Sequence, residues 1–173
     1  MLTGRDSWLL AFLVLVLLVA APSGGEGADR AQSPDLPPHV EFCQQLKTVL
    51  AAAGSGLSAL RTSRDPARDS VWQSSVSLAG GNDCRVYAGD PAAYICTRYS
   101  GDREGDSDTA YNQAVHRLKK CLPAGWSAQE KVTGSRIQTR ATGKAGWPVV
   151  RVVSEVEQGE GYLVEFWVDV AGK

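Results

Sequence analysis

Two stretches of the chain carry apolar residues at three- and four-residue steps, which is the spacing of an amphipathic helix. The first stretch runs from Val40 to Arg61, and the second runs from Thr109 to Leu122. We expect Gly54 and Gly56 to weaken the second half of the first helix, because glycine is a poor helix former. The second helix should end before Pro123, since proline cannot continue a helix.

Between these helices, apolar and polar residues alternate, as they do in strands with one buried face. The segment from Val71 to Tyr99 is predicted to form a meander of three strands, with turn residues at Gly80–Asp83 and Ala88–Ala92. A three-residue loop at the first turn would set apolar residues opposite each other, Leu78 with Cys84 and Val76 with Val86.

Four further strands are predicted after the second helix, at Ala128–Thr133, Arg136–Thr142, Pro148–Glu157 and Tyr162–Val170. A three-residue loop between the last two would align one face, pairing Val150 with Val170, Val152 with Val168, Ser154 with Phe166 and Val156 with Val164. The other face of this pair would then carry Arg151 opposite Asp169, Val153 opposite Trp167, and Glu155 opposite Glu165.

This order of elements, α-βββ-α-ββββ, predicts an α+β fold. We expect two helices packed on one face of a mostly antiparallel sheet, stabilised by disulfides. The pattern leaves the order of strands between the two halves open. The formal net charge is −1 and the two signs are interspersed, so no basic stripe indicates nucleic-acid binding.

An uncharged apolar run, Trp8 to Ala21, precedes the predicted domain and is followed by small residues. It is shorter than the roughly 20 residues of a membrane span, and its layout is typical of a secretory signal peptide. We therefore expect a signal peptide at residues 1–25 with cleavage between 23 and 28, a flexible lead-in at 26–38, and a single domain at 39–173. An uncleaved N-terminal anchor is the alternative. The expected location is periplasmic or extracellular, with no stable membrane span after the signal is removed.

All four cysteines lie in the portion expected to be exported, where an even count favours disulfides. The turn at 88–92 sets Cys84 directly opposite Cys96, at a separation that a cross-strand bridge can span. Cys43 and Cys121 remain, one near the start of the first helix and one near the end of the second. These ends meet if the helices run antiparallel. Since no Cys-x-x-Cys pair occurs, a zinc or redox site is the weaker interpretation.

Motifs for catalysis are sparse. The chain has two histidines, His39 and His116, and no Gly-x-Ser-x-Gly nucleophile elbow or phosphate-binding loop. The sequence GSGLS at 54–58 is only superficially similar to the elbow and is predicted to lie inside a helix. We expect no cofactor and no metal ion.

Acidic residues offer two weaker candidates for a site. Asp102, Glu104, Asp106 and Asp108 alternate in a predicted loop, but the spacing does not match a calcium loop. A solvated loop that caps the second helix through Ser107 or Asp108 fits better. Glu155 and Glu165 are expected side by side on one sheet face. Paired carboxylates can divide acid and base roles, although no cleft is implied there.

The features above favour a small exported binding protein, with inhibition as one form of that role, over an enzyme. Its candidate surface is the sheet face away from the valines, where tryptophan would anchor a partner. The expected partner is another protein of the envelope or medium. The alternatives are an exported enzyme whose acidic residues assemble only in the fold, and a structural or envelope-associated subunit. The candidate surface comprises Trp167, Val153, Arg151, Glu155, Glu165 and Trp147.

Overall fold

A computed structural model describes residues 38–78, 80–157 and 161–171 of the chain. The α-helices among these residues are α1 (Pro38–Ala53) and α2 (Glu104–Cys121), with a short 3-10 helix at Ser58–Leu60. The strands are β1 (Arg61–Arg64), β2 (Val71–Ser74), β3 (Asp83–Tyr87), β4 (Ala93–Gly101), β5 (Ser127–Thr133), β6 (Arg136–Thr142), β7 (Val149–Glu157) and β8 (Gly161–Asp169). The predicted signal peptide at 1–25 lies outside the described residues, and so does the predicted lead-in, apart from Pro38, which begins α1.

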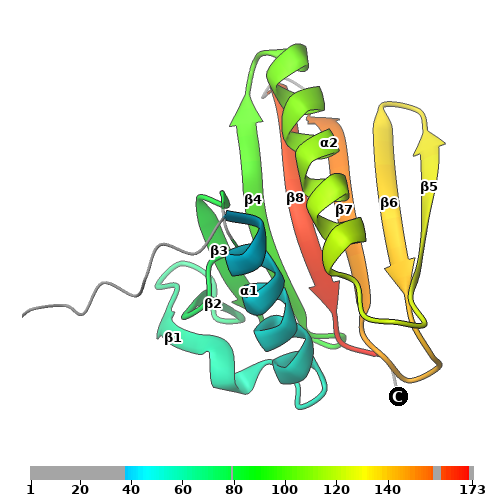
Figure 1. Ribbon diagram of the computed structural model, residues 1–173. Helices are drawn as coiled ribbons and strands as arrows, with labels where there is room; N and C mark the ends of the chain where they lie inside the picture. The colour runs from blue at the N-terminus through cyan, green and yellow to red at the C-terminus, as the bar shows by residue number, and fades with distance from the viewer. Residues whose placement is uncertain (1–37, 79, 158–160, 172–173) are drawn as a thin grey trace, which may run out of the picture. The chain divides into compact units, whose positions relative to one another are not determined.

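The eight described strands form one antiparallel sheet in the order β1-β2-β3-β4-β8-β7-β6-β5. Both helices lie on the same face of this sheet (Figure 1). The predicted α+β class with two helices on one face is therefore confirmed. The sheet also contains the short edge strand β1, which the sequence pattern did not predict; its first residue, Arg61, was assigned to the first helix. Each half of the chain contributes four consecutive strands, and the last strands of the two halves, β4 and β8, pair at the centre.

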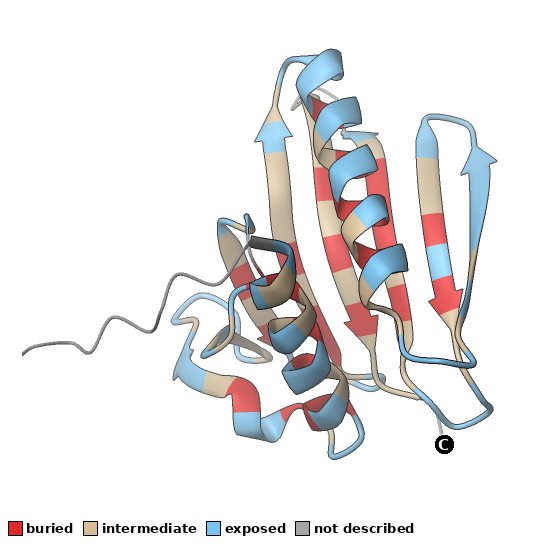
Figure 2. Cartoon of the chain, in the orientation of Figure 1, coloured by how far each residue is buried: buried red, intermediate tan, exposed pale blue. Residues whose placement is uncertain are grey.

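The core lies between the helices and the central strands β4, β8 and β7 (Figure 2). Phe42 of α1 meets Phe166 of β8 edge to face, with ring centroids 5.7 Å apart. On the sheet side the core consists mainly of inward-facing valines, which suit a pleated, buried surface. The outer strand β5 is mostly exposed. The core therefore ends before this edge of the sheet.

Helix α1 ends earlier than the apolar spacing predicts. It stops at Ala53, and the chain turns through Gly56 (φ 80°) and Leu57 (φ 64°) in left-handed conformations. The GSGLS segment therefore forms a turn and the start of the 3-10 helix, so the prediction that it lies inside a helix is wrong. Leu57 is nevertheless completely buried. Its apolar side chain packs in the core, although its backbone is not helical.

The register predicted for the first hairpin of the meander is also wrong. Trp72, and not Val76, lies opposite Val86, because β2 ends at Ser74. Tyr94 explains the early end. Its hydroxyl donates to the Val76 carbonyl (3.1 Å) and accepts from the Leu78 amide (3.3 Å). A side chain thus satisfies backbone groups that a strand would have paired.

Strands β7 and β8 pair two residues away from the predicted register. Val150 lies opposite Val168, and Val152 lies opposite Phe166. The reason is that β8 is a central strand, whose position must also suit β4 on its other side. A shift of two residues keeps every side chain on its predicted face, because side chains alternate with a period of two.

Helix α2 begins at Glu104, inside the segment that was predicted to be a polar loop. Glu104 and Asp106 lie in its first turn, where acidic side chains interact favourably with the helix dipole. The predicted capping role of Ser107 is wrong, because its side chain is buried inside the helix. Its hydroxyl oxygen lies 3.2 Å from that of Ser154 on β7.

Two of the predicted hairpins match the structure in register. Cys84 lies opposite Cys96 and Val86 opposite Tyr94 in the β3–β4 pair. Thr133 lies opposite Arg136 across the predicted two-residue turn between β5 and β6. In both hairpins the observed register is the one that the turn residues and the flanking pattern favour.

Candidate functional site

The sheet face opposite the helices carries a continuous row of polar and aromatic side chains. The register aligns Arg85 of β3, Ile95 of β4, Trp167 of β8 and Arg151 of β7 across four neighbouring strands. We call this row, with the residues beside it, the open face. Alternation places its members there, since their chain neighbours point into the core.

Trp167 is held in place by its neighbours on the open face. The Arg151 guanidinium lies over the indole, 4.8 Å from the ring centroid. Arg151 itself donates two hydrogen bonds to Asp169, from Nε to Oδ2 (2.6 Å) and from Nη2 to Oδ1 (2.7 Å). A bidentate pair of this kind fixes the guanidinium plane, and the fixed plane orients the indole stacked beneath it.

Glu165 is tied to the same group. It accepts a hydrogen bond from the Trp167 indole nitrogen, with Nε1 and Oε2 2.9 Å apart. Burial, and then the negative charge of Glu155 and Glu157, raises the pKa of the Glu165 carboxyl, although the Trp167 hydrogen bond acts in the opposite direction. A carboxylate whose pKa is raised in a partly buried position is a feature of many functional sites.

A cleft of about 380 Å³ opens beside Glu165 on the open face. It extends over strands β3, β4 and β8 and is bounded by the loop between β1 and β2. The cleft is lined by Arg68, Ser70, Val71, Asp83, Arg85, Tyr87, Ile95, Thr97 and Glu165. Its size is within the range of small-ligand sites, and it combines apolar floor residues with charged ones.

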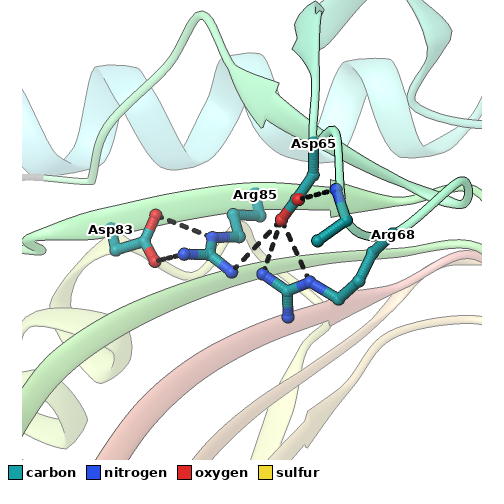
Figure 3. A network of polar contacts seen from close by, with 5 residues as sticks. Asp65, Arg68, Asp83 and Arg85 are labelled. Atoms are coloured by element: carbon teal, nitrogen blue, oxygen red, sulfur yellow. Dashed lines mark hydrogen bonds and ion pairs between the residues drawn. The ribbon is translucent and has the colours of Figure 1, made fainter.

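Charged residues form a network at the rim of this cleft (Figure 3). Asp65 accepts from Arg68, with Nη2 and Oδ2 2.7 Å apart, and lies 3.9 Å from Nη1 of Arg85. Arg85 is also paired with Asp83. The Ala67 backbone amide, which donates to Asp65, lowers the pKa of that carboxyl, and Arg68 adds to the effect. The network keeps the loop between β1 and β2 folded over the cleft.

Sequence reasoning missed this cleft. The local signal was the dipeptide Asp65-Pro66, which favours a turn, followed by Arg68, the ion-pair partner of Asp65. Nothing in the local pattern indicated that this turn would return over β3. That placement depends on the pairing of β1 with β2 and of β2 with β3.

The residues of the predicted binding surface do not all lie on one surface of the structure. Trp167, Arg151, Glu155 and Glu165 lie on the open face, as expected. Val153 is on this face but is only 2% exposed, opposite Glu165 and Gln138, so it offers no contact area. The predicted pairing of Glu155 with Glu165 is also wrong, since Glu155 lies opposite Leu163. Trp147 lies elsewhere, packed against Trp126 on the helix side of the sheet.

The cysteines form two disulfides, Cys84–Cys96 and Cys43–Cys121, which is the pairing that the hairpin register favours. The helices do not run antiparallel, however. Both run in the same sense along the sheet, with α1 beginning beside the end of α2 (Figure 1). The two cysteines meet because the helices are staggered. With all four cysteines bridged, the chain has no free thiol for nucleophilic chemistry.

Other predicted sites find no support in the described part of the chain. No group of three or more metal-ligating side chains occurs among these residues, and Asp102, Glu104, Asp106 and Asp108 spread over the start of α2. His39 and His116 are exposed. No described helix is both long and apolar enough to cross a membrane.

We compared the chain with known protein families, with curated proteins and with solved structures, and none of them matches. The function must therefore be argued from the residues themselves.

Proposed function

We propose that this chain is an exported, non-catalytic binding domain that holds another protein of the envelope or medium through its open face. The observation that carries the proposal is the row formed by Arg85, Ile95, Trp167 and Arg151. Arginine and tryptophan are the residue types that most often dominate binding energy at protein interfaces. Export is supported by the two disulfides and by the apolar N-terminal run.

The open face is suited to binding because it is already ordered. The Arg151–Asp169 pair and the Trp167–Glu165 hydrogen bond hold the indole in one orientation. A side chain that is fixed before binding loses less conformational entropy when a partner covers it. The cleft beside the row is large enough to receive a side chain of the partner. If that partner is an enzyme, occupation of its active site would make the domain an inhibitor.

The test is affinity capture with the oxidised full chain, from envelope extracts and growth medium of the source cells. We expect one or a few proteins to be retained, and we expect Trp167→Ala to reduce retention at least tenfold. A tenfold loss corresponds to about 1.4 kcal/mol, and an interface hot spot of about 2 kcal/mol would give about thirtyfold. Trp147→Ala is the matched control, because it truncates the same side chain type on the other side of the sheet.

Retention of every partner by folded Trp167→Ala would refute the proposed surface. Loss of the partners in Trp147→Ala, with Trp167→Ala unchanged, would also refute it. A captured enzyme should be assayed with and without the domain, since a fall in its activity would identify the role as inhibition.

One observation favours the second candidate, an enzyme. Glu165, with its raised pKa, and Asp83 line the same cleft, and two carboxyl groups in different environments can divide acid and base roles. An enzyme would turn over a substrate at a rate that falls at least 100-fold in Glu165→Gln, as expected for loss of a general acid or base. A binding domain would show no turnover to lose, and its partner retention would change far less in Glu165→Gln than in Trp167→Ala.

A further inference from the structure

A second hollow lies on the helix side of the sheet, away from the open face. It has a volume of about 720 Å³ and is formed by α1, the end of α2, and the connections that follow α2 and β6. We call it the tryptophan groove. Its lining residues are Cys43, Lys47, Leu50, Ala51, Gly54, Cys121, Pro123, Trp126, Gly146, Trp147 and Pro148. Volumes of this size accommodate small organic ligands.

Two indoles form one side of the groove. The ring centroids of Trp126 and Trp147 are 5.7 Å apart, and the ring planes are tilted by 41°. Both pack over the backbone of Gly143. A β-carbon there would overlap Cε3 of Trp147 and lie 3.0 Å from Cε2 of Trp126. The indole pair therefore requires a residue without a β-carbon at position 143.

The opposite side of the groove is aliphatic and covalently fixed. Leu50 and Ala51 come from α1, and the Cys43–Cys121 disulfide joins α1 to the end of α2. The bridge closes a segment with a sequence separation of 78 residues and sets the distance between the two helix ends. The groove is thus held open by a covalent bond as well as by packing.

The charged side chains named at the groove are basic. Lys47 is the only charged side chain in its lining, and it is exposed without an ion-pair partner among the described residues. A second ammonium group, Nζ of Lys144, lies 5.9 Å from the centroid of the Trp147 ring. Within the part of the chain that the structure describes, no acidic side chain lines the groove. A ligand that complements this surface carries an apolar body and a negative charge at one end.

We propose that the tryptophan groove binds a small amphiphile with an alkyl body and one anionic head group, which lies beside Lys47. An alkyl body fits better than a flat aromatic one, because the tilted indoles leave no parallel slot and the remaining walls are leucine, alanine and proline. This activity is independent of the proposed partner of the open face. The domain thus has a proposed small ligand in addition to its proposed protein partner.

The test uses decanoate as the probe and the oxidised full chain labelled with ¹⁵N. Decanoate should bind with a measurable dissociation constant in calorimetry. It should shift the indole N–H signals of Trp126 and Trp147, assigned through Trp→Phe variants, while the Trp167 signal stays in place. Decanol, with the same chain and no charge, should bind about two- to fivefold more weakly, the contribution of one exposed ion pair.

Lys47→Met separates the charge from the packing, because methionine keeps an apolar side chain on α1. This variant should remove the preference for decanoate over decanol and leave decanol binding unchanged. Trp147→Ala should weaken both probes at least tenfold, and Trp167→Ala should weaken neither.

Absence of decanoate binding to the folded protein would overturn the proposal. Equal binding of decanoate and decanol by the unmodified chain would overturn the anionic head group, and so would an undiminished preference in Lys47→Met. Stronger binding of decyltrimethylammonium than of decanoate would reverse the assigned charge and overturn the ligand class. Shifts confined to Trp167 would overturn the assignment of the site.

Discussion

Trp167 lies against the guanidinium of Arg151, whereas Trp147 lies against Trp126 and the backbone of Gly143. The first indole is oriented by ion pairs and hydrogen bonds on an exposed sheet. The second is oriented by packing against Trp126 and Gly143. Two side chains of the same type thus form surfaces of different chemistry, one charged and one apolar. This difference underlies our two proposals, a protein partner for the open face and a small amphiphile for the groove.

The disulfides provide the largest expected contrast between the two surfaces. On the chain-entropy model, the double substitution Cys43→Ala and Cys121→Ala should lower the free energy of unfolding by about 4 kcal/mol. The same change at Cys84 and Cys96, which close a shorter segment, should cost about 3 kcal/mol. Denaturant unfolding of both variants measures this difference.

The two disulfides should also differ in their effect on decanoate binding. Loss of the Cys43–Cys121 bridge should weaken decanoate binding, because it frees one side of the groove, while loss of Cys84–Cys96 should leave that binding intact in the folded protein. Equal effects of the two variants on decanoate would contradict a groove held by its own bridge.

The ion pair on the open face is the next largest effect. The Arg151 and Asp169 side chains are 22% and 21% exposed, so their bidentate contact is partly desolvated. Arg151→Ala should therefore lower the free energy of unfolding by about 1–2 kcal/mol and release the Trp167 indole. The readouts are urea denaturation and the line width of the Trp167 indole signal.

Arg64→Ala is the matched control for that prediction. Arg64 also pairs with an aspartate, Asp69, but these side chains are 52% and 92% exposed. Its removal should change the free energy of unfolding by less than about 0.5 kcal/mol. A cost equal to that of Arg151→Ala would show that burial does not distinguish the two pairs.

A smaller effect is expected in the groove from Gly143→Ala. The new β-carbon would overlap Trp147, whose ring must move away. Because Trp147 is 38% exposed and can swing outward, we expect a cost of only about 1 kcal/mol. Decanoate affinity should fall while partner capture by the open face is retained. An unchanged affinity would mean that the indole pair does not shape the groove.

The smallest effect concerns the pH dependence of stability. The raised pKa of Glu165 means that the folded protein binds this proton more tightly than the unfolded chain does. Stability is therefore lost as pH rises from the ordinary glutamate pKa through the folded pKa, and Glu165→Gln should remove that loss. The check is a series of urea midpoints between pH 4 and 8. Because burial is the first cause, the difference should persist at high salt.

The local sequence pattern predicted the register of two hairpins, β3–β4 and β5–β6, correctly. The β3–β4 hairpin and the Cys84–Cys96 pair could be predicted because a short turn sets both. The sheet face of Trp167 and Arg151 was also predicted correctly, although the predicted β7–β8 register was wrong. Face follows from alternation, which survives a two-residue shift, whereas register follows from the neighbours on both sides.

The cleft and the tryptophan groove could not be predicted in this way. The cleft needs the loop after β1 to lie over β3, and the groove gathers residues from α1, from the end of α2 and from two later connections. The sequence of each segment, taken alone, predicts an ordinary turn or helix. Only their packing creates a hollow, since a cavity belongs to the space between elements and leaves no periodic signal in any one of them.

The sequence by itself determined which residues point inward, where the tight turns lie and which cysteines can pair. These properties depend on the pleat of a strand, the pitch of a helix and the reach of a short loop. The tertiary structure alone decided that β4 and β8 meet at the centre, that the helices run in the same sense, and that Trp147 and Trp167 serve different surfaces. Those outcomes depend on how distant segments share one core, because many arrangements satisfy the same local periodicity and long-range packing selects among them.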